Sequence, residues 1–208
     1  MCWSGGKDSA LALQAALRDS SLRVEALLTT VTEGYERISM HGVRCALLVE
    51  QAQAVGLPLE QVRIPIQASN AAYEAAMRAL LQRYQARGVS RVIFGDLFLQ
   101  DIRSYRERQL ATIGMRGLFP LWLKETHYLA HDFIAAGFRA ILVCIDPKQI
   151  DPSFCGREFD EALLAELPPS ADPRGENGEF HTFVYDGPIF RQRRVQVVRG
   201  EVVHRDGF

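Results

Sequence analysis

The chain has 208 residues, of which 48% are hydrophobic and 24% charged, and its formal net charge is −1 at pH 7. This composition is typical of a globular protein and excludes disordered, collagen-like and coiled-coil chains. The near-zero charge gives no reason to expect a nucleic-acid partner. Apolar runs such as 140–145 are far shorter than the ~20 residues of a membrane-spanning helix, and no leader precedes the first polar motif. We therefore expect no membrane partner.

Short, β-branched segments along the first 118 residues predict strands, and these lie at 24–31, 62–66 and 91–95. Helical periodicity is present at 9–18, 43–55 and 70–87, with Asn70 as the expected N-cap of the last helix. Strands that alternate with helices predict right-handed βαβ units and a parallel sheet covered on both faces. The first part is thus expected to be a Rossmann-like α/β domain.

The pattern changes at Phe119-Pro120-Leu121. A helix at about 126–136 and a strand at 138–145 are predicted, followed by a proline-rich acidic stretch. Segments 195–198 and 201–204, around Arg199-Gly200, predict a β-hairpin. We therefore divide the chain into a larger α/β domain, residues 1–118, and a smaller α+β domain, residues 119–208.

Charge and cysteine placement add two expectations. Residues 63–116 contain nine arginines and four acids, whereas residues 146–186 contain ten acids and three basic residues. The basic block suits a phosphate-bearing ligand and the acidic block suits Mg²⁺, although solvated helix faces explain both equally well. The four cysteines form no C-x-x-C pair, so neither a disulfide framework nor a zinc site is expected, and a cytoplasmic location fits.

The most informative segment is Ser4-Gly5-Gly6-Lys7-Asp8-Ser9, directly before the first predicted helix. Paired glycines let the backbone approach a ligand, and the amides and dipole of the helix N-terminus favour an anion. Lys7 adds a positive charge, the two serines add hydroxyl groups, and Asp8 either holds Mg²⁺ or caps the helix. The segment is not a Walker A loop, because Asp8 follows Lys7 and no glycine stands five residues before Gly6. Only residues 1–3 precede it, so either the expected strand is very short or the numbering begins inside a longer chain.

This hexapeptide resembles the SGGxDS signature of the PP-loop, or N-type ATP pyrophosphatase, superfamily. The resemblance implies a site for ATP and Mg²⁺ in which ATP is cleaved between its α and β phosphates. It also implies that the loop holds the pyrophosphate, with Lys7 and Asp8 catalytic and Asp8 a magnesium ligand. The residues assigned to the nucleotide are Ser4, Gly5, Gly6, Lys7, Asp8, Ser9, Thr29, Gly95 and Asp96. Asp96 also follows a predicted strand, where α/β sheets bind ligands.

A second polar signature occupies residues 172–182, with the sequence D-P-R-G-E-N-G-E-F-H-T. A surface loop held by its own hydrogen bonds is the simplest interpretation. Together with the D-G-P-I-F segment at 186–190, however, it resembles the signature block of the diphthine–ammonia ligase family. Shorter similar pieces occur in the same order at 95–96, 105–108, 120–122, 137–140 and 155–159. The resemblance assigns catalytic and substrate-binding roles to Glu176, Asn177, Glu179 and His181, and substrate-binding roles to Tyr105, Glu107 and Arg108.

The resemblance implies a ligase that adenylates a carboxylate with ATP, releases pyrophosphate and forms an amide with ammonia. In the family the acceptor is diphthine on an elongation factor. For this chain the acceptor could be a carboxylate on a small molecule or on a protein, and both stay open. A homodimer also stays open. Two alternatives also stay open, a PP-loop tRNA-modifying enzyme and a non-catalytic ATP- or AMP-binding regulator.

Three further residue groups have competing interpretations. Ser104 and Glu107 have capping-box spacing, which competes with a ligand role for Glu107. His127 and His131 have i,i+4 spacing, for which a helix surface is the better interpretation than a metal site because no third ligand is apparent. His41 is a candidate to line the nucleotide site.

Overall fold

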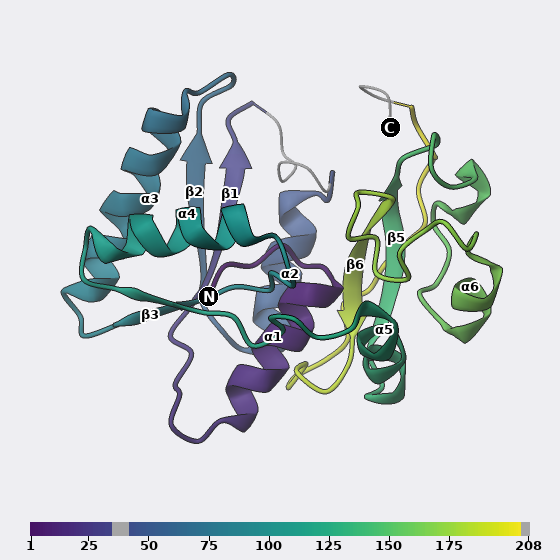
Figure 1. Ribbon diagram of the computed structural model, residues 1–208, viewed down its shortest axis with the longest axis horizontal. Coiled ribbons are helices and arrows are strands. Elements are labelled where there is room, and N and C mark those ends of the chain that lie inside the picture. Colours follow the sequence, from purple (N-terminus) through teal and green to yellow (C-terminus); the bar gives the residue numbers. More distant parts are fainter. Residues whose placement is uncertain (35–41, 205–208) are drawn as a thin grey trace.

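The computed structural model describes residues 1–34 and 42–204 and shows parallel strand pairs connected by helices, followed by one antiparallel pair (Figure 1). The helices are α1 (Lys7–Arg18), α2 (Cys45–Val55), α3 (Asn70–Gln85), α4 (Gln100–Ala111), α5 (Thr126–Ala135) and α6 (Glu161–Glu166), with the 3₁₀ turn η1 (Pro152–Phe154). The strands are β1 (Leu27–Thr32), β2 (Leu59–Ile64), β3 (Arg91–Ile93), β4 (Arg116–Leu118), β5 (Arg139–Ile145) and β6 (Phe180–Asp186). The predicted α/β class is confirmed.

Residues 1–3 occupy a strand position between the two parallel pairs, β1–β2 and β3–β4. Cys2 forms a parallel bridge with Leu28, and the Trp3 amide donates to the Leu28 carbonyl at 2.7 Å. On the other side, the Cys2 amide donates to the Ile93 carbonyl of β3 at 2.9 Å. Residues 1–3 therefore take the strand position directly before the predicted phosphate loop, residues 4–9, and the spatial order is β2, β1, residues 1–3, β3, β4.

The second half is built on β5 and β6, which pair antiparallel and bring Cys144 opposite His181. In Figure 1, α1 and α2 lie between this pair and the β1–β2 pair, and α1 contacts both β3 and β6. Three parts of the chain therefore meet at one place: the carboxyl end of residues 1–3, the start of α1 and the edge of β6.

One large cluster of buried apolar side chains runs through both halves of the chain. It includes Leu13 and Leu48 from the first half and Phe133, Leu142 and Phe183 from the second. The principal core is shared by residues on both sides of 118–119. The division of the chain into two domains at this point stays a prediction. No helix in the described parts of the chain is both long and apolar enough to span a membrane.

Three local predictions are wrong. The chain from 195 to 204 forms no hairpin; instead the Val195 amide donates to the Tyr185 carbonyl at 2.8 Å, and the Arg199 side chain donates to the Cys155 carbonyl. The Val195 backbone and the Arg199 side chain are thus bonded to earlier parts of the chain. Asn70 is not the cap of α3, because the Ser69 hydroxyl accepts the capping hydrogen bond from Ala72 N.

The third error concerns the proposed capping box of Ser104 and Glu107. Helix α4 begins at Gln100, so both residues lie inside the helix rather than at its start. Strands β4 and β6 and helix α6 were not expected from the sequence.

Candidate functional site

The predicted phosphate loop, residues 4–9, is held against the edge of β6. The Gly5 carbonyl accepts a hydrogen bond from the Val184 amide at 2.9 Å. The Lys7 amide donates to the Thr182 hydroxyl at 3.1 Å, which caps α1 because its own N-cap residue, Gly6, has no side chain to do so. The first turn of α1 therefore depends on a residue 175 positions away in the chain.

Gly5 has to be a glycine for two reasons. Its φ of +79° lies in the left-handed region, and an added Cβ would lie 2.6 Å from the Leu48 side chain. The loop serines fix the turn from inside: Ser9 donates to the Gly6 carbonyl at 2.9 Å, and the two hydroxyls of Ser4 and Ser9 lie 3.2 Å apart. The sequence-predicted loop is thus a rigid turn at a helix N-terminus.

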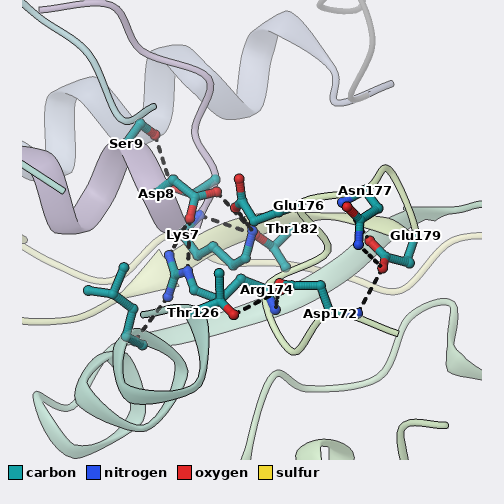
Figure 2. A network of polar contacts seen from close by, with 12 residues as sticks. Lys7, Asp8, Ser9, Thr126, Asp172, Arg174, Glu176, Asn177, Glu179 and Thr182 are labelled. Atoms are coloured by element: carbon teal, nitrogen blue, oxygen red, sulfur yellow. Dashed lines mark hydrogen bonds and ion pairs between the residues drawn. The ribbon is translucent and has the colours of Figure 1, made fainter. Parts of the chain in front are cut away.

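Four charged side chains meet at the start of α1 (Figure 2). Lys7 is buried, and its Nζ donates to Asp8 Oδ2 at 2.8 Å and lies 3.9 Å from Glu176 Oε1. Arg174 is completely buried; its Nε donates to Asp8 Oδ1 at 3.0 Å, and its Nη2 contacts the same oxygen. Two cations and two acids from the loop and from the 172–182 signature therefore form one cluster.

The cluster shifts the titration of its two acids in opposite directions. Burial alone would raise the pKa of Asp8, but Arg174 and Lys7 outweigh it and lower that pKa to about 2. Burial, followed by the negative charge of Asp8, raises the pKa of Glu176 to about 7. Asp8 is therefore ionised at neutral pH, whereas Glu176 is divided between its two protonation states.

Glu179 organises the signature loop itself. Its carboxylate accepts the Asp172 amide at 2.7 Å, the Asn177 amide at 2.9 Å and the Asn177 side-chain Nδ2 at 3.1 Å. Burial works to raise its pKa, but these donors outweigh burial and lower it. Asp172 in turn accepts a hydrogen bond from the Thr126 hydroxyl at 2.8 Å, which attaches the loop to the start of α5.

His181, the second-last residue of the 172–182 signature, lies on β6 opposite Cys144. Burial, and then the positive charge of Lys7, lowers the pKa of His181. The imidazole is accordingly held toward its neutral form beside the charged cluster.

Gly95 and Asp96 follow β3 and approach α1 from the other side. A Cβ on Gly95 would lie 2.9 Å from the backbone carbon of Asp8, so this close approach requires glycine. Asp96 pairs with Arg106 of α4, whose Nε lies 2.9 Å from Asp96 Oδ2, and burial raises the pKa of Asp96. Thr29 is buried within β1.

The predicted substrate residues of α4 have other partners. Tyr105 donates to Glu74 at 2.8 Å, Glu107 pairs with Arg103 at 2.9 Å, and Arg108 is exposed. In the described parts of the chain, no hydrogen bond or ion pair joins them to the cluster of Lys7, Asp8, Arg174 and Glu176, and their substrate roles stay predictions.

The histidines outside the 172–182 signature, His127 and His131, are not part of the charged cluster in the described residues. His127 and His131 lie on α5 with ring centroids 4.6 Å apart, and His131 pairs with Glu161 at 2.9 Å. Within residues 1–34 and 42–204, no group of three or more His, Cys, Asp or Glu side chains could hold a metal ion. His41 lies outside the described residues.

Sequence reasoning did not assign roles to Arg174, Thr182 or Gln51. The first two stand inside the 172–182 signature, where a positively charged residue among acids is a usable signal. Gln51 has no local signal, because its surroundings in the sequence are those of an ordinary helix.

Comparison with known proteins matches both halves of the chain. A family model described as the diphthamide synthase N-terminal domain matches residues 1–117, and one described as the diphthamide synthase C-terminal domain matches residues 125–207. A diphthine–ammonia ligase of Schizosaccharomyces pombe is 28% identical over 109 residues, which is 50% of this chain and 18% of that protein. The diphthine–ammonia ligase of Mus musculus is 24% identical over 178 residues, which is 83% of this chain and 67% of that protein. The Rattus norvegicus protein of the same name gives the same values.

Proposed function

Since this chain belongs to the diphthamide synthase family, we propose that it is an ATP-dependent ligase that adenylates a carboxylate and then forms an amide with ammonia. The relatives named diphthine–ammonia ligase support the reaction class. The acceptor is proposed only as a carboxylate, small or protein-borne, because the chain spans 18% and 67% of the length of these two relatives.

One observation carries the proposal: the phosphate loop and the 172–182 signature meet in a single cluster. Lys7, at the helix N-terminus, lies 3.9 Å from Glu176 of the signature. A helix N-terminus with a lysine suits the phosphates of ATP, and the signature contributes an acid with a pKa of about 7 at the same point. The group proposed to act on the nucleotide, Lys7, and the group proposed to act on the acceptor, Glu176, are thus adjacent.

In the first step, an acceptor carboxylate oxygen attacks the α-phosphorus of ATP. The bond from that phosphorus to the α–β bridging oxygen breaks, and its electron pair leaves with pyrophosphate. In this proposal the N-terminus of α1 and Lys7 neutralise this developing charge, and their fixed positions avoid the cost of reorientation. The product is an acyl-adenylate, in which AMP is a good leaving group.

In the second step, the nitrogen of ammonia attacks the acyl carbon and AMP leaves with the electron pair of the acyl–oxygen bond. Ammonia enters as a neutral nucleophile, and forming the amide releases one proton. We assign the acceptance of that proton to Glu176, because a carboxyl with a pKa of about 7 is substantially ionised at neutral pH and is a stronger base than an ordinary glutamate.

Magnesium fits this site as a companion of the nucleotide. Mg²⁺ is commonly held by one or two carboxylates together with substrate phosphates, and Asp8 is the carboxylate that we assign to it. Among the described residues, Asp8 Oδ2 accepts a hydrogen bond from Lys7 alone and so retains acceptor capacity. When bound, the ion would supply further positive charge for the phosphates.

The test is product analysis with α-labelled ATP, Mg²⁺, ammonium and a set of carboxylate acceptors. We expect AMP and pyrophosphate, with AMP formation dependent on the acceptor. Lys7→Ala should reduce turnover by at least about 100-fold because it removes the loop charge. The exposed Lys148→Ala is the control and should be unaffected.

Other products would overturn the proposal. ADP and phosphate would contradict adenylation, and ATP binding without turnover for any acceptor would favour a regulatory protein instead. AMP formation that depends on tRNA would favour a tRNA-modifying enzyme.

A further inference from the structure

Helix α2 carries a fully buried glutamine on its core-facing side. Gln51 has no exposed surface, and the neighbouring Leu48, Ala52 and Val55 belong to the apolar core. A buried amide without partners destabilises a protein by several kcal/mol in the least favourable case, so its hydrogen bonds require an account.

Gln51 uses both of its N–H groups and its oxygen. Its Oε1 accepts from the Trp3 indole Nε1 at 2.7 Å, and its Nε2 donates to the Gly5 carbonyl at 3.0 Å and to the Val184 carbonyl at 2.5 Å. One side chain is therefore bonded to the strand before the phosphate loop, to the loop and to β6.

The bond to Gly5 has a directional consequence for the loop. In a trans peptide the C=O of one residue and the N–H of the next point in opposite directions. The Gly5 carbonyl is held toward Gln51 and the Val184 amide, so the Gly6 N–H points away from them and toward the Ser4 hydroxyl, to which it donates at 3.3 Å. Gly6 is the N-cap of α1, where the backbone amides form the anion-binding end of the helix.

We propose that Gln51 is a positioning residue for the phosphate loop: it fixes the Gly5–Gly6 peptide and thereby the turn that presents the N-terminus of α1 to the bound phosphate. Gln51 is completely buried, so it acts through the groups that it bonds rather than by contacting the ligand. The inference depends on the proposed function only in taking pyrophosphate as the anion that the loop binds.

The test measures pyrophosphate affinity by calorimetry, in the presence of Mg²⁺, for the wild type and two variants of similar side-chain size. Gln51→Met removes all three hydrogen bonds, and we expect affinity to fall at least about 10-fold. Gln51→Glu keeps the acceptor for Trp3 but loses both amide donors, and we expect a loss of at least the same size.

Gln14→Met is the matched control. Gln14 is also a buried helical glutamine, and its Nε2 has no hydrogen-bond partner within the described residues. It lies on α1 but does not bond the loop, so its replacement should leave pyrophosphate affinity within twofold of the wild type.

A local readout shows whether each variant keeps the expected structure. The chain has two tryptophans, Trp3 and Trp122, and the indole N–H of each gives one ¹H–¹⁵N signal. Gln51→Met should shift the Trp3 signal and leave the Trp122 signal in place, whereas Gln51→Glu should retain a hydrogen-bonded Trp3 signal. If Gln51→Met does not fold, Gln51→Glu decides the question.

Two results overturn the inference: affinity within twofold of the wild type in a folded Gln51 variant, or an equal loss in Gln14→Met. Failure of the proposed function gives a different result. A wild type that binds pyrophosphate but forms no AMP contradicts the ligase and leaves the Gln51 test intact, whereas a wild type that does not bind pyrophosphate contradicts the role of Gln51.

Discussion

Glu176 is an acid whose protonation changes near neutral pH. Burial, and then Asp8, raises its pKa from an ordinary value of 4.5 to about 7. Between these two values the folded protein holds a proton that the unfolded chain has lost. The free energy of unfolding therefore falls as pH rises from about 4.5 to about 7, and this contribution is constant above pH 7.

Replacing Glu176 with glutamine removes this dependence. We expect Glu176→Gln to be more stable than the wild type at pH 8, by no more than about 3 kcal/mol, with the difference narrowing toward pH 4.5. Urea unfolding at several pH values measures the effect, and the exposed Glu201→Gln is the control.

Other titrating groups do not disturb this comparison. The pKa of Asp8 is lowered to about 2, so its stabilisation is complete above its ordinary value of 3.8 and is lost only as pH falls through about 2. His181 contributes equally to both proteins and cancels in the difference. A difference that is independent of pH would contradict the raised pKa of Glu176.

At the scale of elements, local sequence patterns predict the βαβ half well and the second half less well. The expected strand 91–95 corresponds to β3, and 138–145 corresponds to β5, because each is a short apolar run of suitable length. Strand β6 was missed because nearly all of its residues are buried, so it lacks the alternation that marks a half-exposed strand. The valines of 195–204 have high β-propensity, but among the described residues a single backbone hydrogen bond, from Val195 to Tyr185, joins them to a strand. Propensity alone does not form a sheet.

In the candidate site, too, local sequence patterns predict some residues and miss others. The loop glycines and Lys7 are predictable because their chemistry is contiguous in the sequence. Thr182 and Gln51 contact the loop across 175 and 46 positions, and no local pattern encodes such pairings. Arg174 is visible in the signature, but its complete burial against Asp8 is not.

Thr182 is a testable case of an element completed from a distance. Thr182→Val keeps the shape of the side chain and removes the acceptor for the Lys7 amide at the start of α1. We expect the free energy of unfolding to fall by about 1 kcal/mol, as for the loss of an N-cap.

Thr112→Val provides the comparison, since that hydroxyl is exposed and bonds only within its own helix end. It should change stability by no more than about 0.5 kcal/mol. Equal effects of the two substitutions in urea unfolding would show that Thr182 does not cap α1.

At the scale of the whole molecule, Arg174 connects the two halves. Besides Asp8 of α1, its Nη1 donates to the Leu129 carbonyl of α5 at 3.0 Å. Together with the shared core, this contact leads us to expect one cooperative unfolding transition, with fluorescence and circular dichroism curves that coincide.

Arg174→Met should lower the free energy of unfolding by about 3 kcal/mol, because it removes one of the two cations that compensate the partly buried Asp8 carboxylate. The control is Arg193→Met, which breaks an exposed pair with Glu50 and should cost no more than about 1 kcal/mol. Two separate transitions in the wild type, or a small effect of Arg174→Met, would contradict this connection.

The hydrogen bonds between the loop and β6 also have a consequence for synthesis on the ribosome. A nascent chain that has emerged only as far as β5 already contains Gly5, Gly6 and Lys7, but not the Thr182 and Val184 groups that fix them. The turn at the start of α1 therefore acquires these hydrogen bonds only after β6 has been synthesised, and shorter nascent chains lack them.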